Sequence, residues 1–173
     1  MFEKDYRLYG KHATYAKFMK DDAGIFNYII DVYMNGAIWG LMNNRTAPRD
    51  RDSKDDVNIL ASQFSERRDK CMFLYRLVML LDETTDLTPQ ERIDRAFRDD
   101  AEEDSPEREE KLKANLEVFH SYVRGGIEKL YEDFIVDCTT KDDYMNRVHE
   151  MVTNFADTLP GVDLDGKLSK LLG

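Results

Sequence analysis

The stretch Gly24–Arg45 (GIFNYIIDVYMNGAIWGLMNNR) constrains the fold more than any other part of the chain. Its apolar side chains point in nearly every direction around a helix axis, whereas a surface helix is apolar along one stripe only. We therefore expect a central helix that other helices surround. Asn27, Asp31 and Asn35 interrupt the run, so it does not predict a membrane span.

Asp31 is the one acidic residue of this apolar stretch. A buried carboxylate costs several kcal/mol unless it is paired or hydrogen-bonded, so we expect a partner from a neighbouring helix. Arg67 is the first candidate, because a guanidinium stays charged when it is buried, and Arg124 is the second. Two other interpretations stay open: an exposed Asp31 at a gap between helices, and a catalytic Asp31.

Apolar residues at alternating steps of three and four predict two long helices. One seam runs from Val57 to Leu81 and the other from Leu112 to Phe134. Four helix starts are marked by a capping residue, which is followed by proline or acidic residues. These capping residues are Ser53, Thr88, Ser105 and Thr140. Shorter helices are predicted over residues 5–20, 89–98 and 141–158.

The sequence gives no clear signal for a strand, because no solvated period-two alternation extends beyond about four residues. The predicted fold class is therefore all-α: a single-domain helical bundle in which two long helices pack around a central apolar helix. We expect residues 1–160 to form the bundle and residues 161–173 to form a loosely held tail.

Glycines occur inside two of the predicted helices, at Gly36 and Gly40 and at Gly125 and Gly126. Glycine in a helix interior costs about 1 kcal/mol relative to alanine, which favours a structural reason for its presence. One interpretation is a close approach of two helices. The other is a break after Arg124 that presents this arginine to a partner.

The chain is acidic, with a formal net charge of -10. Direct nucleic-acid binding through a general basic surface is therefore not expected, because such binding depends on excess lysine and arginine. Eight acids against one arginine are concentrated between Asp99 and Glu110. This connector is either a solvated loop or a contact for a basic partner.

The N-terminus has no apolar segment of the signal-peptide type, and no long apolar run suggests a membrane partner. We therefore expect a cytoplasmic protein. Cys71 and Cys138 lie on separate predicted helices without metal-ligand spacing, so packing is a better interpretation than a disulfide or a zinc site.

The motif Glu117-x-x-His120 has the spacing that di-iron helical bundles use, but a second copy is missing. Phosphate-binding loops and nucleophile elbows are also absent from the sequence. We therefore predict no metal, no cofactor and no catalytic residue. A metal-dependent enzyme that uses Asp31, Glu117 and His120 stays as the weakest alternative.

Arginines gather in three places that a protein partner could contact. These interaction candidates are Arg45, Arg49 and Arg51 in one linker, Arg92, Arg95 and Arg98 on a short helix, and Arg124. The alternating charges of the short helix also fit a salt-bridge network within the chain.

Several short motifs resemble small uncharacterised proteins that are encoded beside bacterial DNA phosphorothioation-type restriction genes and other phage-defence genes. They are Asp31-Val32-Tyr33-Met34, Gly40 with Asn44-Arg45, Ala96-Phe97-Arg98-Asp99-Asp100 and Tyr122-Val123-Arg124-Gly125-Gly126. The resemblance implies an accessory component of a multi-protein defence assembly, with no catalytic residue to transfer.

The function expected from the sequence is thus a non-enzymatic, helical interaction subunit of a larger bacterial protein complex. The alternative is an acidic mimic of DNA that inhibits a nucleic-acid-binding protein, which would need carboxylates spaced like duplex phosphates. The sequence does not indicate an oligomeric state.

Overall fold

The structure, a computed structural model, describes residues 1–98 and 106–158 of the chain, and these residues are mostly helical. The elements, in chain order, are β1 (Tyr6–Tyr9), α1 (Lys11–Lys17), the π-helix η1 (Phe18–Asp22), α2 (Ile29–Met42), β2 (Asp56–Ile59), α3 (Ala61–Glu66), α4 (Arg68–Leu81), α5 (Pro89–Phe97), α6 (Pro106–Phe134) and α7 (Lys141–Thr158). Within these ranges, no helix has the length and apolarity that crossing a membrane requires.

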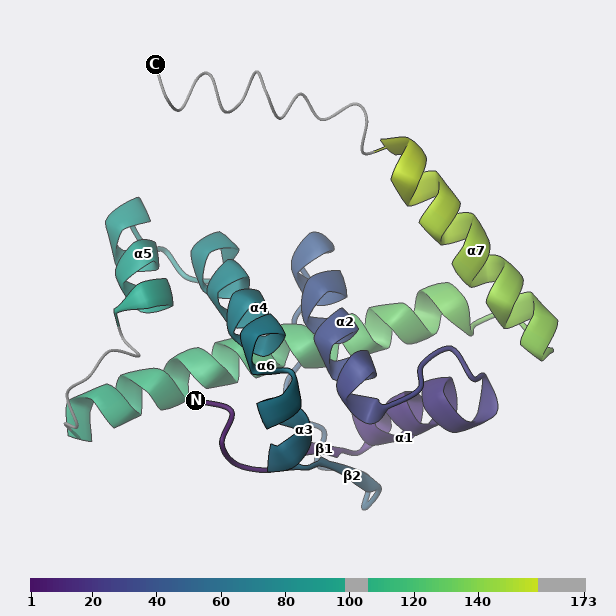
Figure 1. Cartoon of the computed structure of the whole chain (residues 1–173), viewed down its shortest axis with the longest axis horizontal. Helices are drawn as coiled ribbons and strands as arrows, with labels where there is room; N and C mark the ends of the chain where they lie inside the picture. The colour runs from purple at the N-terminus through teal and green to yellow at the C-terminus, as the bar shows by residue number, and fades with distance from the viewer. Residues whose placement is uncertain (99–105, 159–173) are drawn as a thin grey trace.

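Helix α6 is the long rod of the molecule, and α2 and α4 cross it side by side (Figure 1). The most extensive contact between two elements is that of α2 with α6. Their backbones meet at the glycines: a Cβ atom on Gly126 would lie 1.8 Å from the carbonyl oxygen of Gly36. Helix α6 continues through Gly125 and Gly126 without a break, so close approach explains these residues.

The prediction of an uninterrupted helix from Val57 to Leu81 is wrong at its N-terminal end. Residues 56–59 form β2, which pairs antiparallel with β1 and places Leu8 opposite Val57. Leu8 and Ile59 are buried, so packing stabilises the strands although the alternating pattern is only four residues long. The predicted helix over residues 5–20 is wrong only at its N-terminal end, where residues 6–9 form β1; α1 and η1 make the chain helical from Lys11 to Asp22.

Two helices, α3 and α4, replace the expected single rod, because the backbone of Arg67 leaves helical geometry with φ −118° and ψ 22°. The expected start at Ser53 is also wrong. The Ser53 hydroxyl accepts a hydrogen bond from the Asp55 N–H in a turn, and the next helix begins at Ala61. The predicted seam nevertheless identifies buried positions, since Phe64, Cys71 and Val78 all belong to the core.

Other predicted helix starts are confirmed where the structure describes them. Helix α5 begins at Pro89, with the Thr88 hydroxyl accepting from the Glu91 N–H at 3.3 Å. Helix α7 begins at Lys141, with the Thr140 hydroxyl accepting from the Asp143 N–H at 3.2 Å. Residues 99–105 of the acidic connector and the predicted tail 161–173 lie outside the described residues.

The core lies between α6 and the helices that cross it. Aromatic rings from four helices fill it, and Phe119 of α6 lies at its centre, 5.9 Å between ring centroids from both Tyr33 and Tyr75. Cys71 is buried in this core as an unpaired cysteine, and burial raises the pKa of its thiol to about 11. The thiol therefore acts as a packing group at neutral pH.

Candidate functional site

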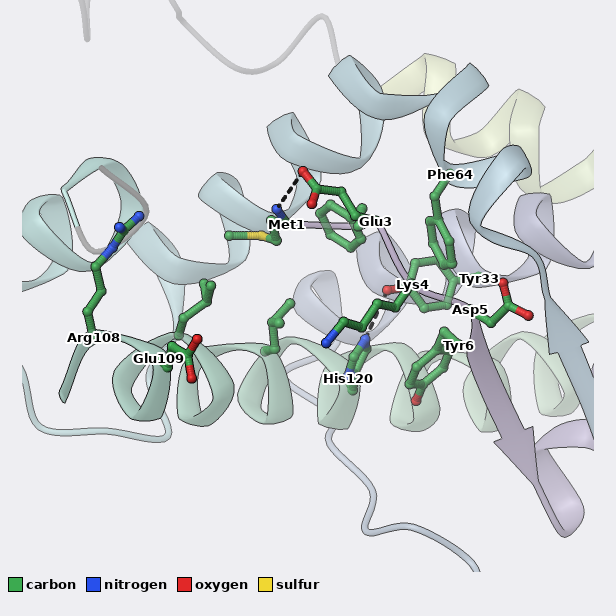
Figure 2. Close-up of a pocket in the computed structure, with 13 residues that line it drawn as sticks. Met1, Glu3, Lys4, Asp5, Tyr6, Tyr33, Phe64, Arg108, Glu109 and His120 are labelled. Carbon is green, nitrogen blue, oxygen red and sulfur yellow. Dashed lines mark hydrogen bonds and ion pairs between the residues drawn. The ribbon is translucent and has the colours of Figure 1, made fainter. Parts of the chain in front are cut away.

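A pocket of about 470 Å³ opens between the N-terminal segment, α3 and the first half of α6 (Figure 2). Its walls are mostly apolar, and charged side chains surround its mouth. The apolar lining consists of Met1, Phe2, Phe64, Leu112 and Leu116, and the charged lining of Glu3, Lys4, Asp5, Arg108 and Glu109. The size and lining are those of a ligand or side-chain binding site.

Phe2 forms one wall of the pocket and links it to the core. Its ring stacks on Phe64 with 5.5 Å between centroids and meets Phe119 edge-on at 6.0 Å. The Phe2 backbone has φ 58°, a left-handed conformation that disfavours residues with a Cβ atom. Ring packing therefore holds this segment in place against the strain of its backbone.

Three aromatic rings form the floor of the pocket. His120 of α6 stacks face to face on Tyr6 of β1, with 4.0 Å between the ring centroids. The same histidine forms a hydrogen bond through Nε2 with the Tyr33 hydroxyl of α2, at 3.1 Å. Figure 2 shows that the floor joins α6 to a strand and a helix that lie far away in the sequence.

The floor is polar but carries no charge at neutral pH. Burial, together with the positive charges of Arg124 and Arg49, lowers the pKa of His120 to about 3. Burial also raises the pKa of Tyr33 well above its ordinary value. A histidine with so low a pKa is a weak base and cannot hold a proton to donate near pH 7.

The Glu117-x-x-His120 motif does not form a site, because its two side chains turn to different partners. The Glu117 carboxylate accepts a hydrogen bond from Arg124 at 2.7 Å, whereas His120 binds Tyr33. No group of three or more His, Cys, Asp or Glu side chains able to hold a metal ion is found in the described ranges.

Arg124 is 3% exposed and does not pair with Asp31. Besides its ion pair with Glu117, it donates from Nε to the carbonyl oxygen of Ala47 at 2.8 Å. This contact fastens the linker after α2 to α6. The hypothesis that a break in α6 presents Arg124 to a partner is therefore wrong, because the folded chain encloses the side chain.

Asp31 lies in the first turn of α2 and not in the middle of a helix. Its carboxylate accepts the Tyr28 N–H at 3.2 Å, which caps the helix, and its Oδ1 lies 3.7 Å from Nε of Arg67. The Asp31 side chain is 26% exposed. Arg67 is thus the neighbouring guanidinium, but capping and partial hydration share the stabilisation of this acid.

The three arginines of the linker after α2 have separate environments. Arg45 forms a forked ion pair with Glu132, at 2.5 and 2.6 Å, and reaches Glu128 at 3.3 Å. Arg49 lies over the ring of Tyr9, with its guanidinium carbon 5.1 Å from the centroid. Arg51 is exposed.

The predicted ridge of Arg92, Arg95 and Arg98 does not form a shared surface. Arg95 is 7% exposed and turns into the protein, where Nη1 donates to Asp82 at 2.8 Å. Arg92 donates to backbone carbonyls at the end of α4. Of the three, only Arg98 is exposed, and it pairs with Asp94 of its own helix at 2.8 Å. The interpretation of intramolecular salt bridges describes these contacts better than a docking ridge.

Asp82, directly after α4, is a buried carboxylate that the sequence analysis did not single out. It accepts hydrogen bonds from Arg95, from the Tyr122 hydroxyl at 2.9 Å, and from the hydroxyls of Thr84 and Thr85 at 2.6 and 2.7 Å. Burial alone would raise its pKa, but these donors hold the pKa of Asp82 well below its ordinary value. The Asp-x-Thr-Thr sequence was the one local signal of this turn.

His12 and Glu128 form a second network that sequence reasoning missed. His12 is almost fully buried in α1, and its Nε2 lies 2.9 Å from Glu128 of α6. Glu128 also accepts Lys11 at 2.9 Å. Burial lowers the pKa of His12 and outweighs the opposing effect of Glu128. No local spacing relates these residues, because 116 positions separate them.

An exposed apolar surface lies on the hairpin of α4 and α5, which Figure 1 shows beside one another. We call it the α4–α5 face; it consists of Phe73, Arg76, Leu81, Ile93 and Phe97. Phe73 is 64% exposed, and Phe97 lies under the Arg76 guanidinium at 5.2 Å. Phe73 and Arg76 are one helical turn apart on α4.

Comparison with known proteins adds no relative: neither family models, nor curated proteins, nor solved structures match this chain.

Proposed function

We propose that the protein is a non-enzymatic interaction subunit that binds a protein partner through the α4–α5 face. The observation that carries this proposal is the exposure of large apolar side chains on one hairpin: Phe73, Leu81, Ile93 and Phe97. Large apolar side chains exposed to water on one hairpin are typical of protein interaction sites.

The rigidity of the hairpin supports this function. The ion pair of Arg95 with Asp82 fastens α5 to the end of α4, and Arg95 also donates to Asn115 of α6 at 2.9 Å. A surface held in one conformation loses little conformational entropy when a partner binds. The α4–α5 face is therefore organised for binding before the partner arrives.

The chemistry of the pocket also fits an interaction subunit better than an enzyme. Its histidine is neutral and already bonded to Tyr33, and its remaining walls are largely apolar. Such a lining recognises a ligand by shape and burial.

The proposed setting is a multi-protein assembly of the bacterial cytoplasm. An accessory role in phage defence is part of the proposal and depends on the short motifs named above, such as Tyr122-Val123-Arg124-Gly125-Gly126.

Affinity purification from native cells tests the proposal. The full chain, tagged and expressed at its natural level, should retain a defined partner, and Phe73→Asp should reduce its recovery at least tenfold. Val152→Asp on α7 is the matched control, because Val152 is also an exposed apolar residue but lies outside the α4–α5 face.

The recovered partner is then purified, and its affinity for the unchanged chain, for Phe73→Asp and for Val152→Asp is measured directly. Equal affinity of the Phe73→Asp variant and the unchanged chain would refute the proposed surface. A chain recovered alone at its natural concentration would refute the proposed function.

A further inference from the structure

Lys4 extends its side chain across the mouth of the pocket toward α6, beside His120 (Figure 2). It is exposed, and no carboxylate within the described residues lies at ion-pair distance from its ammonium group. A lysine without a partner beside apolar walls is a ready binding group for an anion.

The acidic side chains nearest to Lys4 in the sequence are turned to other groups. Asp5 accepts hydrogen bonds from the Asn58 side chain and the Ala61 N–H, both at 2.8 Å. Glu3 lies 3.7 Å from the amino group of Met1. Asp5 is thus held by two hydrogen bonds, and neither Asp5 nor Glu3 forms an ion pair with Lys4 within the described residues.

The interior of the pocket differs sharply from its mouth. Leu112 and Leu116 of α6 line the pocket together with Phe2 and Phe64, and the floor adds the aromatic rings of Tyr6, Tyr33 and His120. The floor carries no formal charge, so it offers no counter-ion to a ligand. A charged ligand group is thus stabilised only at the mouth, and the body of the ligand must be apolar.

We propose that this pocket binds an apolar carboxylate, with the aromatic or aliphatic body between Phe2, Phe64 and Leu116 and the carboxylate on Lys4. Either a free small-molecule acid or the C-terminal carboxylate of a peptide that ends in a large apolar residue has this chemistry. The inference concerns a site separate from the α4–α5 face and goes beyond partner binding there.

Binding of matched probes to the full chain tests this inference. The probes are 2-naphthylacetate, the neutral 2-naphthylacetamide and the cationic 2-(2-naphthyl)ethylamine. Their binding is measured by calorimetry and by NMR of the leucine methyl groups. We expect the acid to bind roughly tenfold more tightly than the amide, because a charge-assisted hydrogen bond is stronger than a neutral one. The methyl groups of Leu112 and Leu116 should shift.

Substitution of the lysine separates charge recognition from burial. Lys4→Gln should reduce the affinity for the acid to that for the amide and leave the affinity for the amide unchanged. Lys54→Gln is the control, because Lys54 is exposed outside the pocket. Phe73→Asp should also leave probe binding unchanged. A failure of the proposed carboxylate pocket is therefore distinguishable from a failure of the proposed α4–α5 interface.

Two peptides identify the source of the carboxylate: N-acetyl-Gly-Phe with a free C-terminus and the same peptide with a C-terminal amide. Lys4-dependent binding of the free peptide above that of naphthylacetate assigns the site to protein C-termini, and the reverse order assigns it to small acids. Equal binding of acid and amide, or no binding of any carboxylate at millimolar concentration, overturns the inference.

Discussion

Gly126 lies where α2 and α6 cross, and its missing side chain sets the distance between the two helices. A Cβ atom there would lie 1.8 Å from the Gly36 carbonyl oxygen, which is backbone and cannot move alone. Gly126→Ala should therefore destabilise the fold by about 3 kcal/mol or more, although alanine is the better helix former. Urea unfolding measures the loss.

Gly24→Ala is the contrasting variant, because a Cβ atom at Gly24 meets open space. Its cost comes only from the positive φ of 71° and should be about 1 kcal/mol. Similar losses for the two variants would contradict a steric role of Gly126.

Asp82 is a residue whose protonation should control stability at acid pH. The pKa of Asp82 in the folded chain lies below its ordinary value near 4. The ionised carboxylate therefore stabilises the fold fully above about pH 4, and this stabilisation is lost as the pH falls below 4 toward the pKa of the folded chain. Asp82→Asn leaves the buried Arg95 without a counter-charge and should cost about 3–5 kcal/mol at pH 7. The difference from the unchanged chain should narrow between about pH 4 and pH 2, as measured by urea unfolding.

Asp94→Asn is the control for Asp82→Asn, because Asp94 pairs with the exposed Arg98. Its effect should be about 0.5 kcal/mol or less. A pH-independent difference between Asp82→Asn and the unchanged chain would contradict the assigned role of Asp82.

His120 should remain neutral throughout the physiological range. Because burial and the nearby arginines lower its pKa to about 3, acidification below its ordinary value near 6.5 favours the unfolded chain, which binds the proton more readily. The ring resonances of His120, assigned with His120→Gln, should not titrate between about pH 5 and pH 8. A midpoint near pH 6.5 would show that the pocket floor can become charged.

At the scale of elements, the capping box of α5 makes a local prediction. The Thr88 hydroxyl accepts the Glu91 N–H, and the Glu91 carboxylate accepts the Thr88 N–H. Thr88→Ala should cost about 1 kcal/mol and accelerate amide exchange at the start of α5. Thr140→Ala should likewise cost about 1 kcal/mol and accelerate amide exchange at the start of α7 only. If either variant accelerated exchange equally in both helices, local capping would be refuted.

At the scale of the whole molecule, α7 is an attachment to the remaining fold. It packs mainly against α6, and its buried residue Tyr144 meets the ring of Phe18 edge-on at 6.0 Å. A chain that ends at Cys138 should keep its cooperative unfolding and lose about 1.5–3 kcal/mol, which is the value of burying one large side chain.

Tyr144→Ala in the full chain is the matched control for this truncation and should account for most of the loss. Urea unfolding followed by circular dichroism gives the free energy of unfolding of the truncated chain and of the Tyr144→Ala variant. A truncated chain without a cooperative transition would show that α7 belongs to the main core.

The parts of the fold that depend on neighbours in the sequence were predictable. The starts of α5 and α7 follow from hydrogen bonds that span three residues, and the burial of α2 follows from its continuous apolar composition. The positions of Phe64, Cys71 and Val78 in the core also follow from helical periodicity, even though the helix is interrupted at Arg67.

Tertiary structure alone decided which strands pair and where the buried charged side chains point. Strand β2 forms because β1 lies beside it, 50 positions earlier, and Arg95 turns inward because Asp82 and Asn115 meet it there. The pocket likewise joins the N-terminal segment to α6. Local patterns encode the hydrogen bonds of a helix, but the burial of a charge depends on partners that only the folded chain brings together.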